Sequence, residues 1–315
     1  MSLINLTYNE LLKVWKQKVF IAPFIILLIP VIILGRWDVV AQQNAKDKTS
    51  WKQELMEQNE KHQKELAKGE VPSLMAKQMK DEIKLNEYRL EHNLPPDVQH
   101  SLFGFMKSCT NLVTLVSLIL ITYASSMISK EHQWGTMNFL MVRPALRTEI
   151  LLSKFAAVIV LYILLCGVLA LFSFGEGVLI YGLSMNSYPE LKIVNGAIIE
   201  QSVAIDIVKS YVYQFLPVLF YATVAFTLST ILKSNGPAII IAVVITAVSD
   251  PIAQVLSQYS WSKFLVFANT DLLMYENGVP LMEGMTLSFS VVMLLGYIGV
   301  LLLLSLLVFK RRDFI

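Results

Sequence analysis

Charged residues and cysteines are scarce in this chain. Only 16% of its 315 residues are charged and 55% are hydrophobic, whereas an ordinary soluble domain is about one quarter charged. The hydrophobic residues are gathered into long runs, which argues against two ordinary soluble domains and indicates membrane spans. Both cysteines, Cys109 and Cys166, lie inside such runs. This argues against a disulfide framework, and neither thiol has the neighbours that a metal site requires.

The motifs of ATP-binding and metal-dependent enzymes are also missing. The sequence contains no GxxxxGK[ST] phosphate loop and no HExxH zinc motif, so nucleotide binding and zinc chemistry by those routes are excluded. The four histidines lack the spacing of metal ligands; they are His62, His92, His100 and His132. The paired acids of intramembrane proteases are absent as well. We therefore expect no enzyme activity, no bound cofactor and no metal site in this chain.

Six apolar segments are long enough to cross a bilayer, which takes about 20 residues. They are residues 19–35, 108–128, 155–182, 211–232, 238–256 and 285–309. The sequence therefore predicts an all-α membrane protein with six transmembrane helices. We expect the third span to break near Gly175-Glu176-Gly177. We expect the fifth to be interrupted at Asp250-Pro251, since proline cannot donate a helical hydrogen bond.

Basic residues are divided unevenly between the two sides of these spans. Three lie in the short loops of one side, namely Lys192, Lys209 and Lys263. Eleven lie on the other side, namely Lys13, Lys16, Lys18, Lys130, Arg143, Arg147, Lys154, Lys233, Lys310, Arg311 and Arg312. Because cytoplasmic loops are enriched in lysine and arginine, both termini are predicted to be cytoplasmic in a multi-pass protein of the cell membrane.

Residues 1–18, which precede the first span at 19–35, have the pattern of an amphipathic helix. Tyr8, Leu11 and Trp15 follow helical spacing, and Thr7 with Glu10 matches a capping box. Such a helix can lie in the membrane interface with its apolar stripe in lipid. The alternative is a plain cytoplasmic anchor for the first span.

Residues 36–107 form the largest polar segment. Residues 38–68 lack proline and glycine and predict one long helix, and residues 73–92 predict a second. We expect an antiparallel helical hairpin on the extracellular side, serving either as a solvated cap or in substrate recognition. Its acids and bases are balanced, which argues against nucleic-acid binding. The remaining five spans lie in residues 108–315.

Two acids lie within or close to the apolar runs. Glu176 lies late in the third span and Asp250 lies in the fifth. Ionisable groups in a bilayer are costly and often mark a substrate pathway or a buried pair. The alternative is a local chain break with the acid at the outer, water-accessible end of the span. Both interpretations stay open.

The loop at residues 129–154 is far more apolar than a solvated connection requires. A short helix is expected from residue 133 to 141, ended by Arg143-Pro144, and Trp134 and Phe139 lie within it. This composition suits insertion into a groove on a soluble partner. It is equally compatible with a loop that lies against the membrane interface, where tryptophan and basic residues are common.

These segments resemble a type-2 ABC transporter permease, the membrane subunit of a bacterial ATP-driven exporter. The resemblance rests on Glu131, Gly135-Thr136, Arg143-Pro144 and Lys154, on the C-terminal segment from Phe309 to Asp313, and on the six-span layout with its amphipathic N-terminal helix. It implies an ATPase-coupling site in the loop, formed by Glu131, Trp134, Gly135, Thr136, Phe139, Arg143 and Arg147. It also implies an interface helix beside that site, with Tyr8, Leu11 and Trp15.

The resemblance further implies partners and cargo. ATP and Mg would be bound by a separate ABC ATPase subunit. A second permease copy or a related permease would complete twelve spans in the bilayer. Similar permeases export antimicrobial peptides or confer immunity to them, and others move lipids, polysaccharides or ions. Two alternatives remain: a membrane-anchored sensor or scaffold with the outer hairpin as receptor, and a secondary transporter, which the few intramembrane acids support only weakly.

Overall fold

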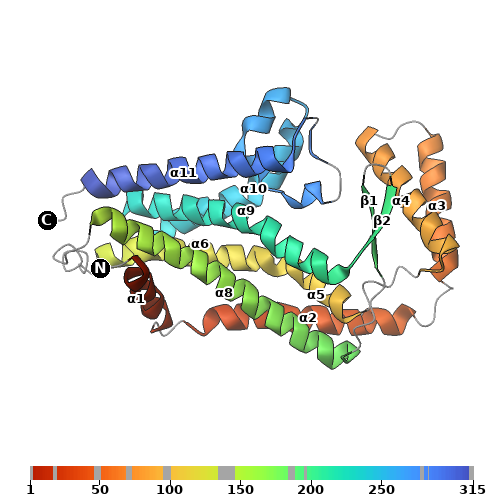
Figure 1. Cartoon of the computed structure of the whole chain (residues 1–315), viewed down its shortest axis with the longest axis horizontal. Coiled ribbons are helices and arrows are strands. Elements are labelled where there is room, and N and C mark those ends of the chain that lie inside the picture. The colour runs from red at the N-terminus through yellow and green to blue at the C-terminus, as the bar shows by residue number, and fades with distance from the viewer. Residues whose placement is uncertain are drawn as a thin grey trace. The chain divides into compact units, whose positions relative to one another are not determined.

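The chain is mainly helical (Figure 1). The computed structural model describes residues 3–16, 20–45, 51–68, 73–94, 101–133, 146–183, 189–194, 197–276, 280–282 and 284–311. The longer helices are α1 (Leu3–Trp15), α2 (Ala22–Ala45), α3 (Trp51–Ala67), α4 (Ser73–Glu91), α5 (Leu102–Cys109), α6 (Val113–Gln133), α8 (Arg147–Tyr181), α9 (Val203–Leu232), α10 (Asn235–Leu256) and α11 (Leu287–Arg311). Single turns of 3-10 helix occur at Thr110–Leu112, Ser260–Phe264, Val266–Asn269 and Leu273–Tyr275.

Six helical segments in the described chain are long and apolar enough to cross a membrane. They are Ala22–Ala41, Leu102–Glu131, Arg147–Tyr181, Val203–Leu232, Asn235–Leu256 and Leu287–Arg311. The prediction of an all-α membrane protein with six such helices is therefore confirmed. One short exception was not predicted, an antiparallel pair of strands, β1 (Glu190–Val194) and β2 (Ala197–Gln201).

Two expected breaks in the spans are wrong. α8 runs without interruption past Gly175 and Gly177 for 35 residues, and α10 continues through Pro251 to Leu256. Pro30 and Pro217 likewise lie inside α2 and α9. Proline is tolerated in membrane helices because neighbouring helices and hydroxyl side chains satisfy the backbone groups that it frees.

The chain forms two compact units, each described here by itself. The first comprises Met1–Leu28, Leu112–Leu169 and Ser210–Ile315. Its interior combines apolar side chains with hydroxyl groups that bond across helices. Ser229 on α9 donates to the carbonyl oxygen of Ser125 on α6, and Ser305 on α11 donates to Thr227 on α9 at 3.0 Å. Small hydroxyl residues allow close helix approach and supply polar contacts where the bilayer offers none.

The second unit comprises Ile29–Asn111 and Ala170–Lys209. In it α3 and α4 lie side by side (Figure 1). Asn86 donates to Asn59 at 3.0 Å, and His62 lies 3.0 Å from Glu82. The two helices run antiparallel, because His62 follows Asn59 on α3 whereas its partner Glu82 precedes Asn86 on α4. Of the helix expected over 38–68, residues 38–45 belong to α2 and residues 51–67 form α3, and residues 46–50 lie outside the described residues.

Candidate functional site

A buried lysine gathers charged groups from three helices of the first unit. Lys154 lies on α8 and is fully buried. Its Nζ lies 2.9 Å from Glu10 Oε2 of α1 and 2.7 Å from Glu131 Oε2 near the end of α6. It also donates to the carbonyl oxygen of Met127 at 3.1 Å. We call Glu10, Lys13, Glu131 and Lys154 the ion cluster.

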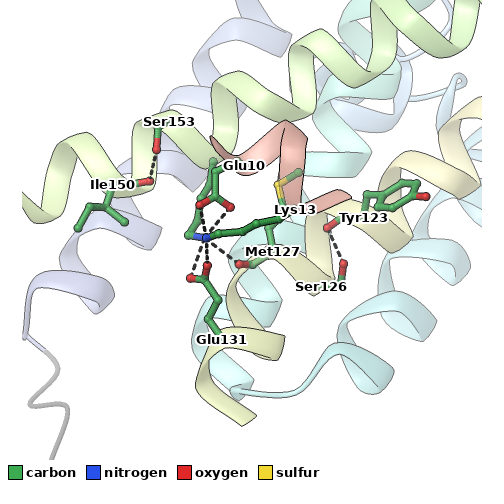
Figure 2. Close-up of polar contacts among 9 residues, drawn as sticks. Glu10, Lys13, Tyr123, Ser126, Met127, Glu131, Ile150 and Ser153 are labelled. Carbon is green, nitrogen blue, oxygen red and sulfur yellow. Dashed lines mark hydrogen bonds and ion pairs between the residues drawn. The ribbon is translucent and has the colours of Figure 1, made fainter. Parts of the chain in front are cut away.

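Lys13 completes the ion cluster from the solvent side. Its Nζ lies 2.6 Å from Glu10 Oε1 and 2.5 Å from Glu131 Oε1, and 46% of its side chain is exposed. Figure 2 shows the carboxylates of Glu10 and Glu131 converging with Lys13 beside them. Two ammonium groups therefore balance two carboxylates, and each carboxylate bridges both lysines. Such reciprocal pairing offsets part of the large free-energy cost of burying charge.

The sequence of α1 brings one particular face to the bundle. Leu6, Glu10 and Val14 are its buried residues, and their four-residue spacing places them on one side of a helix. Tyr8 and Trp15 are 60% and 64% exposed, and Leu11 is half-buried. Tyr8 and Trp15 therefore lie away from the ion cluster. The apolar stripe predicted from the sequence is largely the face that α1 does not bury in this unit.

The capping-box interpretation of Thr7 and Glu10 is wrong. α1 begins at Leu3, so Thr7 lies inside the helix, where its hydroxyl donates to the carbonyl oxygen of Leu3 at 2.9 Å. Glu10 instead reaches Lys154, which lies 144 residues away in sequence. Glu10 was missed as a functional residue. The available signal was its four-residue spacing from Leu6 and Val14.

Opposing effects set the charge state of the ion cluster. Burial raises the pKa of Glu10, but the ammonium groups of Lys154 and Lys13 outweigh burial and hold that pKa below its ordinary value. Burial lowers the pKa of Lys13, but Glu10 and Glu131 outweigh it and hold that pKa above its ordinary value. Both groups are therefore charged throughout the neutral range.

These shifts predict how the contact of α1 depends on pH. The contribution of Glu10 to stability is present above the ordinary carboxylate pKa of about 4.3 and is lost as pH falls through its lowered value. The contribution of Lys13 is present below the ordinary lysine pKa of about 10.4 and is lost as pH rises through its raised value. We expect hydrogen exchange in α1, corrected for intrinsic rates, to be slow at pH 7 and to accelerate in acid below about pH 4.

The variant Glu10→Gln is the control for this pH dependence. It carries no ionisable group at position 10, so its α1 should show a much weaker acid transition than the wild type. Equal protection of the wild-type α1 at pH 3 and pH 7 would contradict the assigned role of Glu10.

Most of the predicted coupling residues lie in a part of the chain that the structure does not describe. Trp134, Gly135, Thr136, Phe139 and Arg143 fall within residues 134–145, and so does most of the expected helix over 133–141. The residues that follow this stretch are described, and their contacts define the start of α8. The carboxylate of Glu149 accepts a hydrogen bond from the backbone N–H of Leu146 at 3.2 Å, as expected for an acid in the first turn of α8.

Arg147 begins α8 and connects it to the last helix. Its guanidinium donates to the carbonyl oxygen of Lys310, near the end of α11, at 2.8 Å. A cation at this place also interacts favourably with the negative end of the α11 dipole. Of the predicted coupling residues, Glu131 and Arg147 thus lie in described contacts, which involve α1, α8 and α11.

The two acids predicted for a substrate path belong to different compact units. Glu176 lies on α8 beside Gly35 of α2, so close that a Cβ at Gly35 would lie 2.9 Å from Glu176 Cγ. Asp250 lies on α10 and lines a cavity in the first unit. Among the described residues, no group of three or more His, Cys, Asp or Glu could hold a metal ion.

The apolar helices define a multi-pass helical membrane protein. The chain belongs to the family described as "Protein of unknown function (DUF2705)", which matches residues 74–315. It is 32% identical over 317 residues to "Uncharacterized protein YhcI" of Bacillus subtilis (strain 168), with 99% of each chain covered. It is also 24% identical over 213 residues to "Uncharacterized membrane protein YdbK" of the same strain. That alignment covers 67% of this chain and 82% of the relative.

Proposed function

We propose that this chain is the membrane-spanning permease subunit of an ATP-binding cassette exporter. It carries no ATPase site of its own in this proposal, and ATP and Mg are bound by a separate ABC ATPase subunit. The cargo leaves through a path made by two permease copies or by this chain and a related permease. An antimicrobial peptide or another amphipathic molecule is the proposed cargo.

The ion cluster is the observation that carries this proposal. Glu131 and Lys154 lie at the two ends of the loop over 129–154, and their ion pair of 2.7 Å joins those ends. Glu10 adds α1 through its 2.9 Å contact with Lys154. A push on the loop would therefore be transmitted to α1, α6 and α8 together, because separating any one of them leaves a buried charge without its partner.

The proposed mechanism uses this linkage as a mechanical connection. ATP closes the two partner ATPase subunits, whose grooves hold the loops and bring them together. Because the ion cluster fixes α1 to α6 and α8, these helices move as one body. The two permease copies then change their packing and open a path to the outside.

The proposed topology places this linkage on the cytoplasmic side. Both termini lie inside the cell, and the antiparallel pair α3–α4 lies outside as an extracellular hairpin. The exposed Tyr8 and Trp15 lie in the membrane interface, where aromatic rings are favoured. Trp15 packs against Phe20 with tilted rings whose centroids are 4.6 Å apart, so the aromatic surface continues from α1 toward α2.

The second candidate function is a membrane-anchored sensor or scaffold. It is favoured by the structured polar region of the second unit, where α3 and α4 share the buried Asn59–Asn86 hydrogen bond and Tyr88 of α4 donates to Glu200 of β2 at 3.3 Å. In this function α3–α4 would be the receptor, and no ATPase would be needed.

Co-purification distinguishes these functions. The tagged chain is expressed with the ABC ATPase proposed as its partner, and the membrane extract is tested for a stable complex. We expect the ATPase to be retained by the wild type and largely lost from Trp134→Ala, because Trp134 is proposed to fill the partner groove. Trp261→Ala removes a tryptophan that is 55% exposed on another segment and should retain the ATPase.

Two results would contradict the exporter proposal. If replacing the whole stretch 134–147 by a Gly/Ser linker leaves ATPase retention and transport unchanged, the loop is not the coupling site. If the wild type never retains the ATPase but binds an external ligand through α3–α4, the sensor function replaces the exporter.

A further inference from the structure

A cavity of about 220 Å³, lined by apolar and polar side chains, lies among the membrane helices of the first unit. It is lined from α6, α9, α10 and the segment that follows α10. Its polar lining includes Ser117, Tyr213, Tyr221, Asp250 and Asp271. Such a concentration of polar groups beside membrane helices is costly unless a ligand or water satisfies them.

Two carboxylates in this cavity have no cation to neutralise them. Neither Asp250 nor Asp271 forms an ion pair with a residue that the structure describes. Asp271 accepts a hydrogen bond from the backbone N–H of Leu273 at 3.0 Å. Burial raises the pKa of Asp271, and the neighbouring Asp250 raises it further. A bound positive charge would relieve this repulsion.

Ser117 gives an independent indication of a ligand. It lines the same cavity, it is only 3% exposed, and its hydroxyl has no hydrogen-bond partner among the described residues. A buried hydroxyl without a partner is destabilising, so such groups are rare. The hydroxyl lies at the side of the cavity formed by α6, whereas Asp250 comes from α10.

We propose that this cavity binds the ammonium group of an organic cation. Asp250 and Asp271 supply the counter-charge, Ser117 accepts a hydrogen bond from the ammonium, and Tyr213 and Tyr221 supply aromatic side chains to the lining. Among the described residues, this cavity holds no group of three or more His, Cys, Asp or Glu that could bind a metal ion. As a statement about cargo, this inference rests on the proposed exporter function and specifies a cationic cargo.

Calorimetric titration of the purified full-length chain tests this inference. The chain is placed in nanodiscs of phosphatidylglycerol, which carries no ammonium, and titrated with benzylammonium or with uncharged benzyl alcohol; empty nanodiscs provide the background. We expect benzylammonium to bind at least about ten-fold more tightly than the alcohol. We also expect Asp250→Asn and Asp271→Asn each to weaken it about ten-fold, as for a charge-assisted contact.

Matched variants separate binding from folding. Glu87→Gln removes an exposed acid of α4 and should leave the affinity unchanged. Ser117→Ala should keep or raise the unfolding temperature of the ligand-free protein, because it removes a buried hydroxyl that bonds to no described protein group, yet it should weaken benzylammonium binding about three-fold. Repeating the titration with phosphatidylethanolamine identifies the source: competition indicates a lipid ammonium as occupant, and unchanged affinity indicates a soluble cation.

The inference is overturned if benzyl alcohol binds as tightly as benzylammonium, or if neither asparagine variant changes the affinity. The titration needs no ATPase, so it fails or succeeds separately from the proposed function. Absent binding with the ATPase still retained overturns the cavity assignment alone. Binding without ATPase retention overturns the exporter and leaves the cation site in place.

Discussion

Replacing Lys154 with alanine is expected to destabilise the membrane bundle by about 3–5 kcal/mol, the usual effect of removing one partner from a buried ion pair. The variant would leave the carboxylates of Glu10 and Glu131 facing each other, with only the half-exposed Lys13 between them. We expect a lower unfolding temperature in detergent and faster hydrogen exchange in α1. The first is measured by thermal unfolding and the second by mass spectrometry.

The controls for Lys154→Ala test charge and position separately. Lys16→Ala removes an exposed lysine just beyond α1 and should change stability by less than about 0.5 kcal/mol. The triple variant Lys154→Met, Glu10→Gln, Glu131→Gln removes the buried charges together, and neutral replacement of this kind is often tolerated. It should recover most of the lost stability. A Lys154→Ala protein as stable as the wild type would contradict the ion-cluster geometry.

Replacing Gly35 with alanine is expected to destabilise the second unit although alanine is the better helix former. A Cβ at this position would lie 2.9 Å from Glu176 Cγ and from Ile180 Cδ1. Relieving that overlap requires the Glu176 and Ile180 side chains to change rotamer or α2 and α8 to move apart, and overpacking of this kind costs about 1–3 kcal/mol where the neighbours cannot adjust freely. The measurement is thermal unfolding in detergent, and Gly35→Leu should show a larger loss.

Gly175→Ala is the matched control because it also replaces a helical glycine in the same unit. A Cβ at Gly175 would meet nothing within 4 Å, so the change should be neutral or stabilise by up to about 1 kcal/mol through helix propensity. Equal effects of the two substitutions would show that propensity, and not helix contact, decides at Gly35.

The sequence predicts the number of spans well and their interruptions badly. Runs such as that in α8 are apolar over their full length, and length with hydropathy is enough to identify a span. A glycine within a span can either interrupt the helix or allow another element to approach closely, and the sequence around Glu176 does not distinguish these two roles. Gly177 permits contact, since a Cβ there would lie 2.7 Å from Leu102 Cδ1, and the helix continues through it.

The strand pair β1–β2 carried a signal that was overlooked. Asn195-Gly196 lies between two segments rich in β-branched residues, and this dipeptide is typical of two-residue β-hairpin connections. The hairpin lies between two long apolar spans, whose hydropathy is a much stronger signal than that of two five-residue strands.

The ion cluster could be predicted only in part. Glu131 and Lys154 were identified by resemblance, but no local pattern pairs them with α1. Lys13 and Glu131 are 118 residues apart in sequence, and Glu10 and Lys154 are 144 residues apart. Glu10 has an alternative local role as a helix-capping acid, and that role is the simpler interpretation of a single sequence. Long-range pairing depends on packing, which periodicity alone does not specify.

The rate of ATP hydrolysis tests the central claim most directly. The proposed partner, an ABC ATPase, is assayed in nanodiscs alone, with the wild-type chain and with the Lys154→Met, Glu10→Gln, Glu131→Gln variant. The account predicts that the wild type changes the rate several-fold, whereas the variant keeps the ATPase bound but leaves it near the rate of the ATPase alone. An identical rate in all three preparations would contradict an energy transfer through this membrane protein.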